Sequence, residues 1–162
     1  MERMSLSRDP ALFERAEAAF RREAARIREL LPDADVQHIG STAVPGSRTK
    51  GDLDLQVRVP QERMAEAEAA LERLYDDNEG SGRTESFRSF KRDDADPPLG
   101  VQLTAIGSDM DFFAQLRDAL AADPQLRERY DALKLRFDGE SMDEYREAKA
   151  AFFAEILGRG AN

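Results

Sequence analysis

The sequence predicts an α+β fold in which a small mixed β-sheet is flanked by helices and followed by a helical C-terminal part. Short segments with strand-like patterns occupy only the middle of the chain. Longer segments whose apolar residues recur at helical spacing precede and follow them. A chain of 162 residues with 41% hydrophobic residues has the size of one domain and can bury a sizeable core.

The first predicted element is a helix that begins at Asp9-Pro10, because proline is tolerated in the first turn of a helix. Apolar residues recur at helical spacing as far as Leu31, and Pro32 ends the pattern. A short strand is expected over 36–39. It leads into the turn-rich loop GSTAVPGSRTKG.

The clearest strand pattern lies over residues 52–59, DLDLQVRV. Apolar and polar side chains alternate along it, so the two kinds of side chain point to opposite faces. The apolar positions are Leu53, Leu55, Val57 and Val59, and the polar positions are Asp52, Asp54, Gln56 and Arg58. We expect a half-buried strand whose polar face is open.

Pro60 opens a second predicted helix, which runs to about Leu74 and is followed by the loop NEGSGR. Strands are expected over 85–92 and 99–106, separated by the exposed turn DDADPP. The paired acids Asp76-Asp77 and Asp93-Asp94 are interpreted as solvated loops.

From Ser108 onward the pattern is helical. Helices are expected over 109–122 and 124–137, and Asp138-Gly139 ends the second of them. Ser141 and Glu144 form an S-x-x-E capping box that opens a third helix.

Composition excludes several classes of protein. The chain has no cysteine and a single histidine, so it can form no disulfide and no cysteine- or histidine-rich metal site. The formal net charge of −9 disfavours extended binding to nucleic acid, whose phosphates require a positive surface. No segment has the length and apolarity of a membrane helix, and the N-terminus is charged where a signal peptide would be apolar. These features favour a cytoplasmic protein.

One constellation points to chemistry: Gly40-Ser41, ten residues, and then Asp52 and Asp54. Two carboxylates at i and i+2 of a strand project from the same face, roughly 6.5–7 Å apart along the chain. Such a pair can converge on divalent cations, which favour oxygen ligands and catalyse phosphoryl-type displacements. Gly40-Ser41 offers backbone N–H groups and a hydroxyl to the phosphates of a nucleotide.

The segment HIGSTAVPGSRTK, residues 38–50, resembles the signature loop of the GrpB family, which belongs to the nucleotidyltransferase-like superfamily. Residues 113–134 and 145–153 are similar to the helical tail of GrpB proteins. The resemblance implies a single domain over 1–162, with a core at about 10–107 and C-terminal helices at about 108–157. It also implies that Gly40, Ser41, Asp52 and Asp54 match the superfamily pattern, with Asp52 and Asp54 as catalytic Mg²⁺ ligands.

The sequence departs from the family pattern at two places. GrpB proteins usually carry a proline and an aliphatic residue where Gly51 and Asp52 stand. On the strand near residue 102 they usually carry His-x-His, where this chain has Gln102 and Thr104. Gln102 is a further candidate metal ligand through its carbonyl oxygen, whereas Thr104 offers only a neutral hydroxyl. These neutral residues leave turnover open and are compatible with nucleotide binding.

The remaining candidates for nucleotide binding are cationic or hydroxyl-bearing. The chain has only four lysines, and each lies within the stretch from about residue 10 to 155 that resembles the family. A lysine supplies a more compact charge than arginine. The candidates are Thr42, Lys50, Arg88, Lys134 and Lys149. Lys91 is interpreted as a residue of a solvated strand edge, and His38 as a packed, hydrogen-bonded residue.

The resulting hypothesis is Mg²⁺-dependent transfer of a nucleoside monophosphate from a nucleoside triphosphate to an unknown acceptor. A second hypothesis is a catalytically degenerate module that binds a nucleotide or a coenzyme A-related metabolite, since some GrpB domains are joined to dephospho-coenzyme A kinase. A third is a protein-interaction domain. Metal dependence separates the first two from the third, and product formation separates the first from the second.

Overall fold

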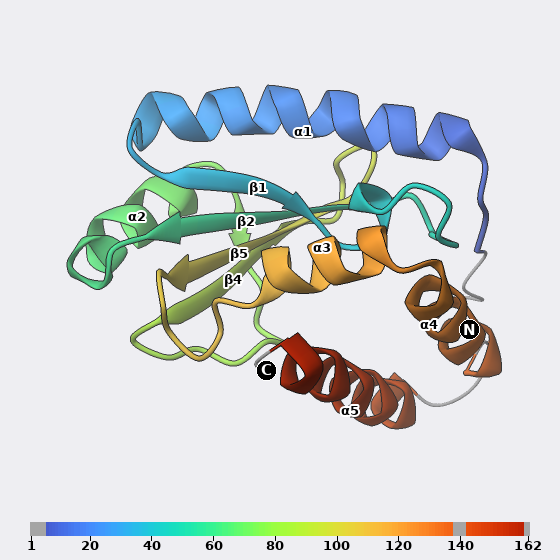
Figure 1. Cartoon of the computed structure of the whole chain (residues 1–162). Helices are drawn as coiled ribbons and strands as arrows, with labels where there is room; N and C mark the ends of the chain where they lie inside the picture. The colour runs from blue at the N-terminus through green and yellow to red at the C-terminus, as the bar shows by residue number, and fades with distance from the viewer. Residues whose placement is uncertain (1–5, 138–141, 161–162) are drawn as a thin grey trace.

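The computed structural model describes residues 6–137 and 142–160. A five-stranded mixed sheet in the order β1-β2-β5-β4-β3 forms its centre (Figure 1). β2 and β5 are parallel, and the other neighbours are antiparallel. The strands are β1 (Asp35–Ile39), β2 (Leu53–Val59), β3 (Asp76–Asp77), β4 (Phe87–Arg92) and β5 (Leu99–Ala105), and the helices are α1 (Pro10–Leu30), α2 (Met64–Glu72), α3 (Phe113–Ala122), α4 (Pro124–Arg136) and α5 (Met142–Gly160). The expected α+β class is confirmed.

The main core lies between the sheet and the helices α1 and α2. Alternation along β2 directs Leu53, Leu55 and Val57 into this core, where they pack with Ile27 of α1 and Leu71 of α2. Asp9 caps α1 by accepting a hydrogen bond from the N–H of residue 11, as its position before a proline predicts. Local sequence and packing therefore agree in this layer.

The helices α3, α4 and α5 pack together on the other side of the sheet (Figure 1). Their own apolar cluster includes Leu116, Leu126, Tyr130 and Phe152. These helices cover the polar face of β2, which the sequence alone predicts to be open. Gln56 on that face has no exposed surface, so the expectation of an open face is wrong there.

Several elements differ from expectation. The helix expected from Pro60 to about Leu74 is α2, which spans Met64–Glu72 after a 3-10 turn at Gln61–Arg63, and the strand expected over 85–92 begins at Phe87. Asp76-Asp77 is the exposed edge strand β3 rather than a loop, because it pairs with β4 opposite Lys91 and Phe90. The first C-terminal helix begins at Phe113 instead of Asp109, because the preceding turn is held by the Asp111 carboxylate, which accepts a hydrogen bond from the N–H of residue 107. The predicted helix break at 138–139 and the cap at Ser141 lie outside the described residues.

In the described part of the chain, no helix combines the length and apolarity needed to cross a membrane.

Candidate functional site

Asp54 of β2 and Asp52, which comes just before this strand, meet the Gly-Ser loop at one end of the sheet. Asp54 lies between Ile39 of β1 and Gly100 of β5 in the strand register. A Cβ atom at Gly40 would lie 2.5 Å from the Asp54 Oδ2 atom, and one at Gly100 would lie 3.3 Å from Oδ1. Gly40 also has a φ of 78°, which favours glycine. Two glycines thus make the space that the Asp54 carboxylate occupies.

A cleft of about 270 Å³ opens beside these carboxylates. It brings together most residues that the sequence places at the site, although they come from the loop, β2, α4 and α5. Its lining consists of Leu6, Gly40, Ser41, Arg48, Thr49, Lys50, Asp52, Asp54, Tyr130, Lys134, Tyr145 and Lys149. Lys134 and Lys149 lie about 80 to 100 residues from the aspartates in sequence, so only the packing of α4 and α5 brings them to this cleft.

Burial shapes the electrostatics of Asp54. The pKa of its carboxyl is raised to about 6, mainly by loss of solvent and also by the charge of Asp52, while the nearby charges of Lys149 and Lys50 oppose the shift. The Asp54 carboxylate forms no hydrogen bond and no salt bridge with any described residue. A largely buried anion without a direct partner is unfavourable in the isolated chain and attracts a cation.

The three lysines of the cleft differ in their surroundings. The Nζ atom of Lys50 lies 3.4 Å from Asp52 Oδ2, and about half of the Lys50 side chain is exposed. Lys134 is buried, contacts the carbonyl oxygen of Arg48 and lies 3.3 Å from Asp131 Oδ1, so it also holds the loop in place. Burial lowers the pKa of Lys134, although Asp131 opposes this effect.

Lys149 is the lysine with the least direct pairing. Its Nζ atom lies 5.8 Å from the ring centre of Tyr145 and 5.5 Å from that of Phe153. Burial lowers the pKa of Lys149, while the charge of Asp54 raises it. Its ammonium group is therefore available to an anionic ligand in the cleft.

The donor set suits one hard divalent cation. Asp52 and Asp54 provide carboxylate oxygens, and Gln102 lines a neighbouring cavity together with Asp54. Within residues 6–137 and 142–160, no group of three or more His, Cys, Asp or Glu side chains could hold a metal. Thr104 is fully buried and its Oγ1 atom accepts a hydrogen bond from Gln56, so it cannot serve as a third ligand.

Hydroxyl groups hold the loop that faces the cleft. Ser41 Oγ and Thr49 Oγ1 lie 2.7 Å apart, and Thr49 Oγ1 accepts a hydrogen bond from the N–H of Gly51. Thr42, expected to bind nucleotide, lies outside the cleft lining. Its hydroxyl donates to the carbonyl oxygen of Asp52 at 3.0 Å, and so it supports the loop from behind.

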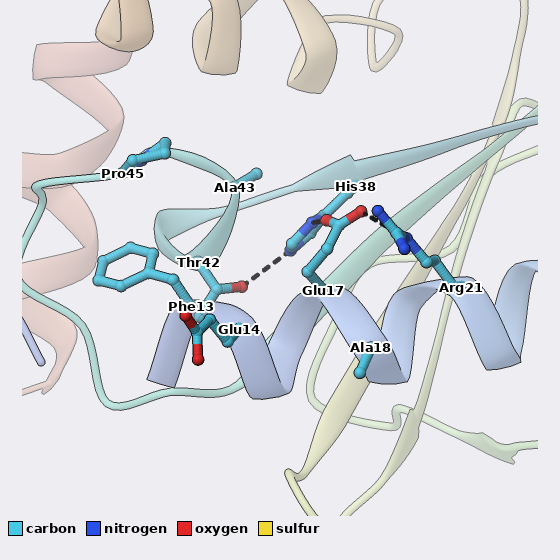
Figure 2. A pocket seen from close by; sticks show the side chains of 9 residues that line it. All are labelled: Phe13, Glu14, Glu17, Ala18, Arg21, His38, Thr42, Ala43 and Pro45. Carbon is cyan, nitrogen blue, oxygen red and sulfur yellow. Dashed lines mark hydrogen bonds and ion pairs between the residues drawn. The ribbon is translucent and has the colours of Figure 1, made fainter. Parts of the chain in front are cut away.

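A second cavity, about 420 Å³, lies on this rear side of the loop, between α1 and residues 42–45 (Figure 2). There His38 Nδ1 lies 3.0 Å from Glu17 Oε2, and its Nε2 atom lies 3.0 Å from Thr42 Oγ1. Burial lowers the pKa of His38, opposed by Glu17. His38 is packed and hydrogen-bonded as the sequence predicts, and this cavity contains neither Asp52 nor Asp54.

Arg88, also expected to bind nucleotide, lies on the opposite face of the sheet. In the β4–β5 register it stands opposite Leu103, whose side chain belongs to the main core. Its guanidinium group contacts Glu72 and lies 3.4 Å from Asp77 Oδ1. The prediction that Arg88 lines the cleft is wrong. The two-residue period of β4 places its side chain on the same face of the sheet as the main core.

Two tyrosines of the cleft lack any signal in the sequence that would assign them to it. Tyr130 and Tyr145 are buried and their hydroxyl groups are hydrogen-bonded to each other. Burial raises the pKa of both hydroxyls. Their helical spacing is typical of packing residues, and both are buried. Their position beside the carboxylates follows from the helix arrangement alone.

A family model described as GrpB protein matches residues 13–159. The chain belongs to the GrpB family. A UPF0157 protein from Vibrio cholerae is 34% identical over 144 residues, covering 88% of this chain and 76% of the relative. A UPF0157 protein from Deinococcus radiodurans is 34% identical over 159 residues, covering 96% of this chain and 81% of the relative.

Solved structures show the same fold at lower identity. The crystal structure of the conserved protein GrpB from Enterococcus faecalis matches with a TM-score of 0.72 and 21% identity, covering 91% of this chain and 95% of that one. The Cid1 poly(U) polymerase bound to MgGTP matches with a TM-score of 0.53 and 14% identity, covering 82% of this chain and 43% of that one. This GrpB protein therefore has a nucleotidyltransferase-like fold.

Proposed function

We propose that this GrpB protein transfers a nucleoside monophosphate from a nucleoside triphosphate to an acceptor hydroxyl or phosphate, with Mg²⁺ as cofactor. The observation that carries the proposal is one cleft that holds two carboxylates together with three lysines and the Gly40-Ser41 loop. Carboxylates suit the metal, and the lysines suit the phosphates that such a metal accompanies. The nucleotidyltransferase-like fold supports the same reaction class.

Each group in the cleft has a distinct proposed role. Asp52 and Asp54 would hold Mg²⁺, which when bound supplies positive charge at the oxygens around the reacting phosphorus. Ser41, the Gly40 backbone and Lys50 would hold the phosphate tail, and Lys149 would neutralise it from the opposite wall. Catalysis then consists of positioning and electrostatic stabilisation within a preformed site.

A second candidate is nucleotide or coenzyme A-related binding without turnover. It is favoured by the absence of a third carboxylate among the described residues that line the cleft and by the burial of Thr104. In this case the cleft would still bind a phosphate-bearing ligand in a metal-dependent manner, but no pyrophosphate would form.

The test is a calorimetric titration of ATP, GTP, CTP and UTP with and without Mg²⁺. We expect Mg²⁺-dependent binding of at least one nucleotide, lost in the double variant Asp52→Asn/Asp54→Asn. The matched control is Asp93→Asn/Asp94→Asn, which removes two exposed carboxylates outside the cleft. Absence of binding to all four nucleotides would contradict the proposal.

Turnover is measured separately, as pyrophosphate released from the nucleotide that binds. Release with an acceptor mixture supports the transferase. Tight binding without any release supports the second candidate, a binding module.

A further inference from the structure

A smaller cavity of about 160 Å³ adjoins the cleft beneath α3. We call it the α3 chamber. Its walls are mainly apolar and are formed by Ile39, Phe113, Leu116, Leu120 and Phe153. The chamber shares Gly40, Asp54, Tyr130 and Lys149 with the cleft. The Asp54 carboxylate therefore lies at the junction of a polar compartment and an apolar one.

The two compartments share Asp54 but differ in the rest of their lining. Ser41, Lys50 and Lys134 line only the cleft, whereas α3 and Gln102 line only the chamber. Phosphates held by the lysines would occupy the cleft side. The chamber is then the place from which a second molecule could reach the phosphorus nearest Asp54.

The chamber has the size of one ring. An apolar cavity of about 150 Å³ lined by Leu, Ile and Phe side chains holds one benzene molecule. The apolar side chains gather on one part of the chamber wall, and the polar groups Asp54, Gln102 and Lys149 lie on the rest of it. Its dimensions and lining fit an apolar group of about that size.

Few polar groups in the chamber are available to a ligand. The Arg117 guanidinium donates to Gln37 Oε1 at 2.8 Å and to the His38 carbonyl oxygen at 3.0 Å, and it also pairs with Asp118. Gln102 forms no side-chain hydrogen bond with the described residues, so its amide can serve a ligand. The chamber thus suits a mainly apolar ligand that carries one or two polar atoms.

We propose that the α3 chamber is the acceptor site and that the acceptor is a small neutral alcohol or phenol with a body the size of a single ring. This inference rests on the proposed function. The acceptor hydroxyl oxygen would bond to the α-phosphorus, and the bond from that phosphorus to the oxygen bridging to the β-phosphate would break. Pyrophosphate leaves and carries away the proton of the hydroxyl.

The size and mainly apolar wall of the chamber disfavour the end of a nucleic-acid strand as the acceptor. A strand end brings phosphates, which require cations, and the wall of the chamber is mainly apolar. The formal net charge of −9 adds no attraction for the rest of a strand. The acceptor is accordingly a small molecule.

The test uses benzyl alcohol as a probe, titrated into the full chain without nucleotide or metal and followed by NMR chemical shifts of the backbone amides. We expect saturable shifts confined to residues around the chamber. Leu116→Trp fills the chamber and should weaken binding at least tenfold. Leu135→Trp is the matched control, because Leu135 lies on α4 with 45% of its surface exposed, and it should leave binding unchanged.

Leu120→Phe is a second, milder filling variant, so the test does not depend on the folding of Leu116→Trp. It should weaken benzyl alcohol binding in the same direction. Absence of saturable shifts, or binding that neither filling variant weakens, would overturn the inference even if Mg²⁺-nucleotide binding is found. Chamber binding with no Mg²⁺-nucleotide binding would overturn the acceptor role while pointing to failure of the proposed function.

Discussion

The two ends of the polar face of β2 carry the same alternating pattern but opposite chemistry. At the carboxyl end, Arg58 donates to both carboxylate oxygens of Asp111, at 2.7 and 2.8 Å, and to Asp35 at 2.7 Å. At the amino end, Asp54 has no hydrogen bond or salt bridge from the described residues, although it is largely buried. The charges at the carboxyl end, which we call the complete end, have their partners within the chain. The Asp54 charge at the amino end, which we call the incomplete end, has none among the described residues.

The two ends thus differ in what their charges do: the charge of Asp111 stabilises the fold, whereas that of Asp54 destabilises it. Hydrogen bonds from Arg58 lower the pKa of Asp111, which means that the folded state favours this carboxylate. Burial raises the pKa of Asp54, which means that the folded state disfavours its charge. A disfavoured charge in a cleft is typical of a functional group, because a ligand can supply the missing partner.

The largest expected effect is loss of stability at the complete end. Arg58→Ala leaves the largely buried Asp111 carboxylate without its bidentate partner, so we expect a loss of about 2–4 kcal/mol in the free energy of unfolding. Urea denaturation measures it. Arg63→Ala is the control, because Arg63 pairs with Glu66 on the surface, and its loss should be much smaller. Equal losses would show that the two ends do not differ in this way.

At the amino end of the polar face of β2, we expect removal of a charge to stabilise the fold instead of weakening it. The pKa of Asp54 is raised in the folded state, so its ionised form lowers the stability of the fold. This loss of stability is absent below about pH 4 and complete above about pH 6. Without divalent cations, Asp54→Asn should therefore stabilise the fold by about 1–3 kcal/mol at pH 8. This gain should disappear near pH 4.

Denaturation at both pH values, with the exposed substitution Asp93→Asn as the control, measures the effect. A variant that is less stable than the parent at pH 8 would contradict the assignment of Asp54 as a disfavoured charge.

The smallest effect concerns the exposed ion pair of the incomplete end. Lys50 and Asp52 are both partly exposed, so Lys50→Ala should change the free energy of unfolding by less than about 1 kcal/mol. It should weaken Mg²⁺-triphosphate binding roughly threefold to tenfold, and monophosphate binding less. Calorimetry with Lys91→Ala as the control tests this. Equal weakening of triphosphate and monophosphate would argue against a role at the phosphate tail.

Sequence patterns predicted helices and strands well where a local period of apolar residues determines the type of element. Alternation along 52–59 predicts that Asp52 and Asp54 point the same way, because the side-chain period of a strand is two, and both do line the cleft although Asp52 lies just before β2. The short edge strand β3 was missed, because two exposed acids carry no pattern of their own and pair only through β4. Arg88 was misplaced for a related reason, since its partner strand decides which face is the core.

The sequence by itself determined the α+β class and the aspartate pair, because periodicity and spacing are local and survive in any tertiary arrangement. The loop at 38–50 carried the resemblance to the GrpB family. Only the tertiary structure decided which polar residues meet. Asp111, just before α3, accepts hydrogen bonds from Gln56 and Arg58 of β2. The packing of α5 brings Lys149 into the same cleft as Asp54. Such contacts join segments far apart in the chain. They depend on how whole helices pack, which no local pattern encodes.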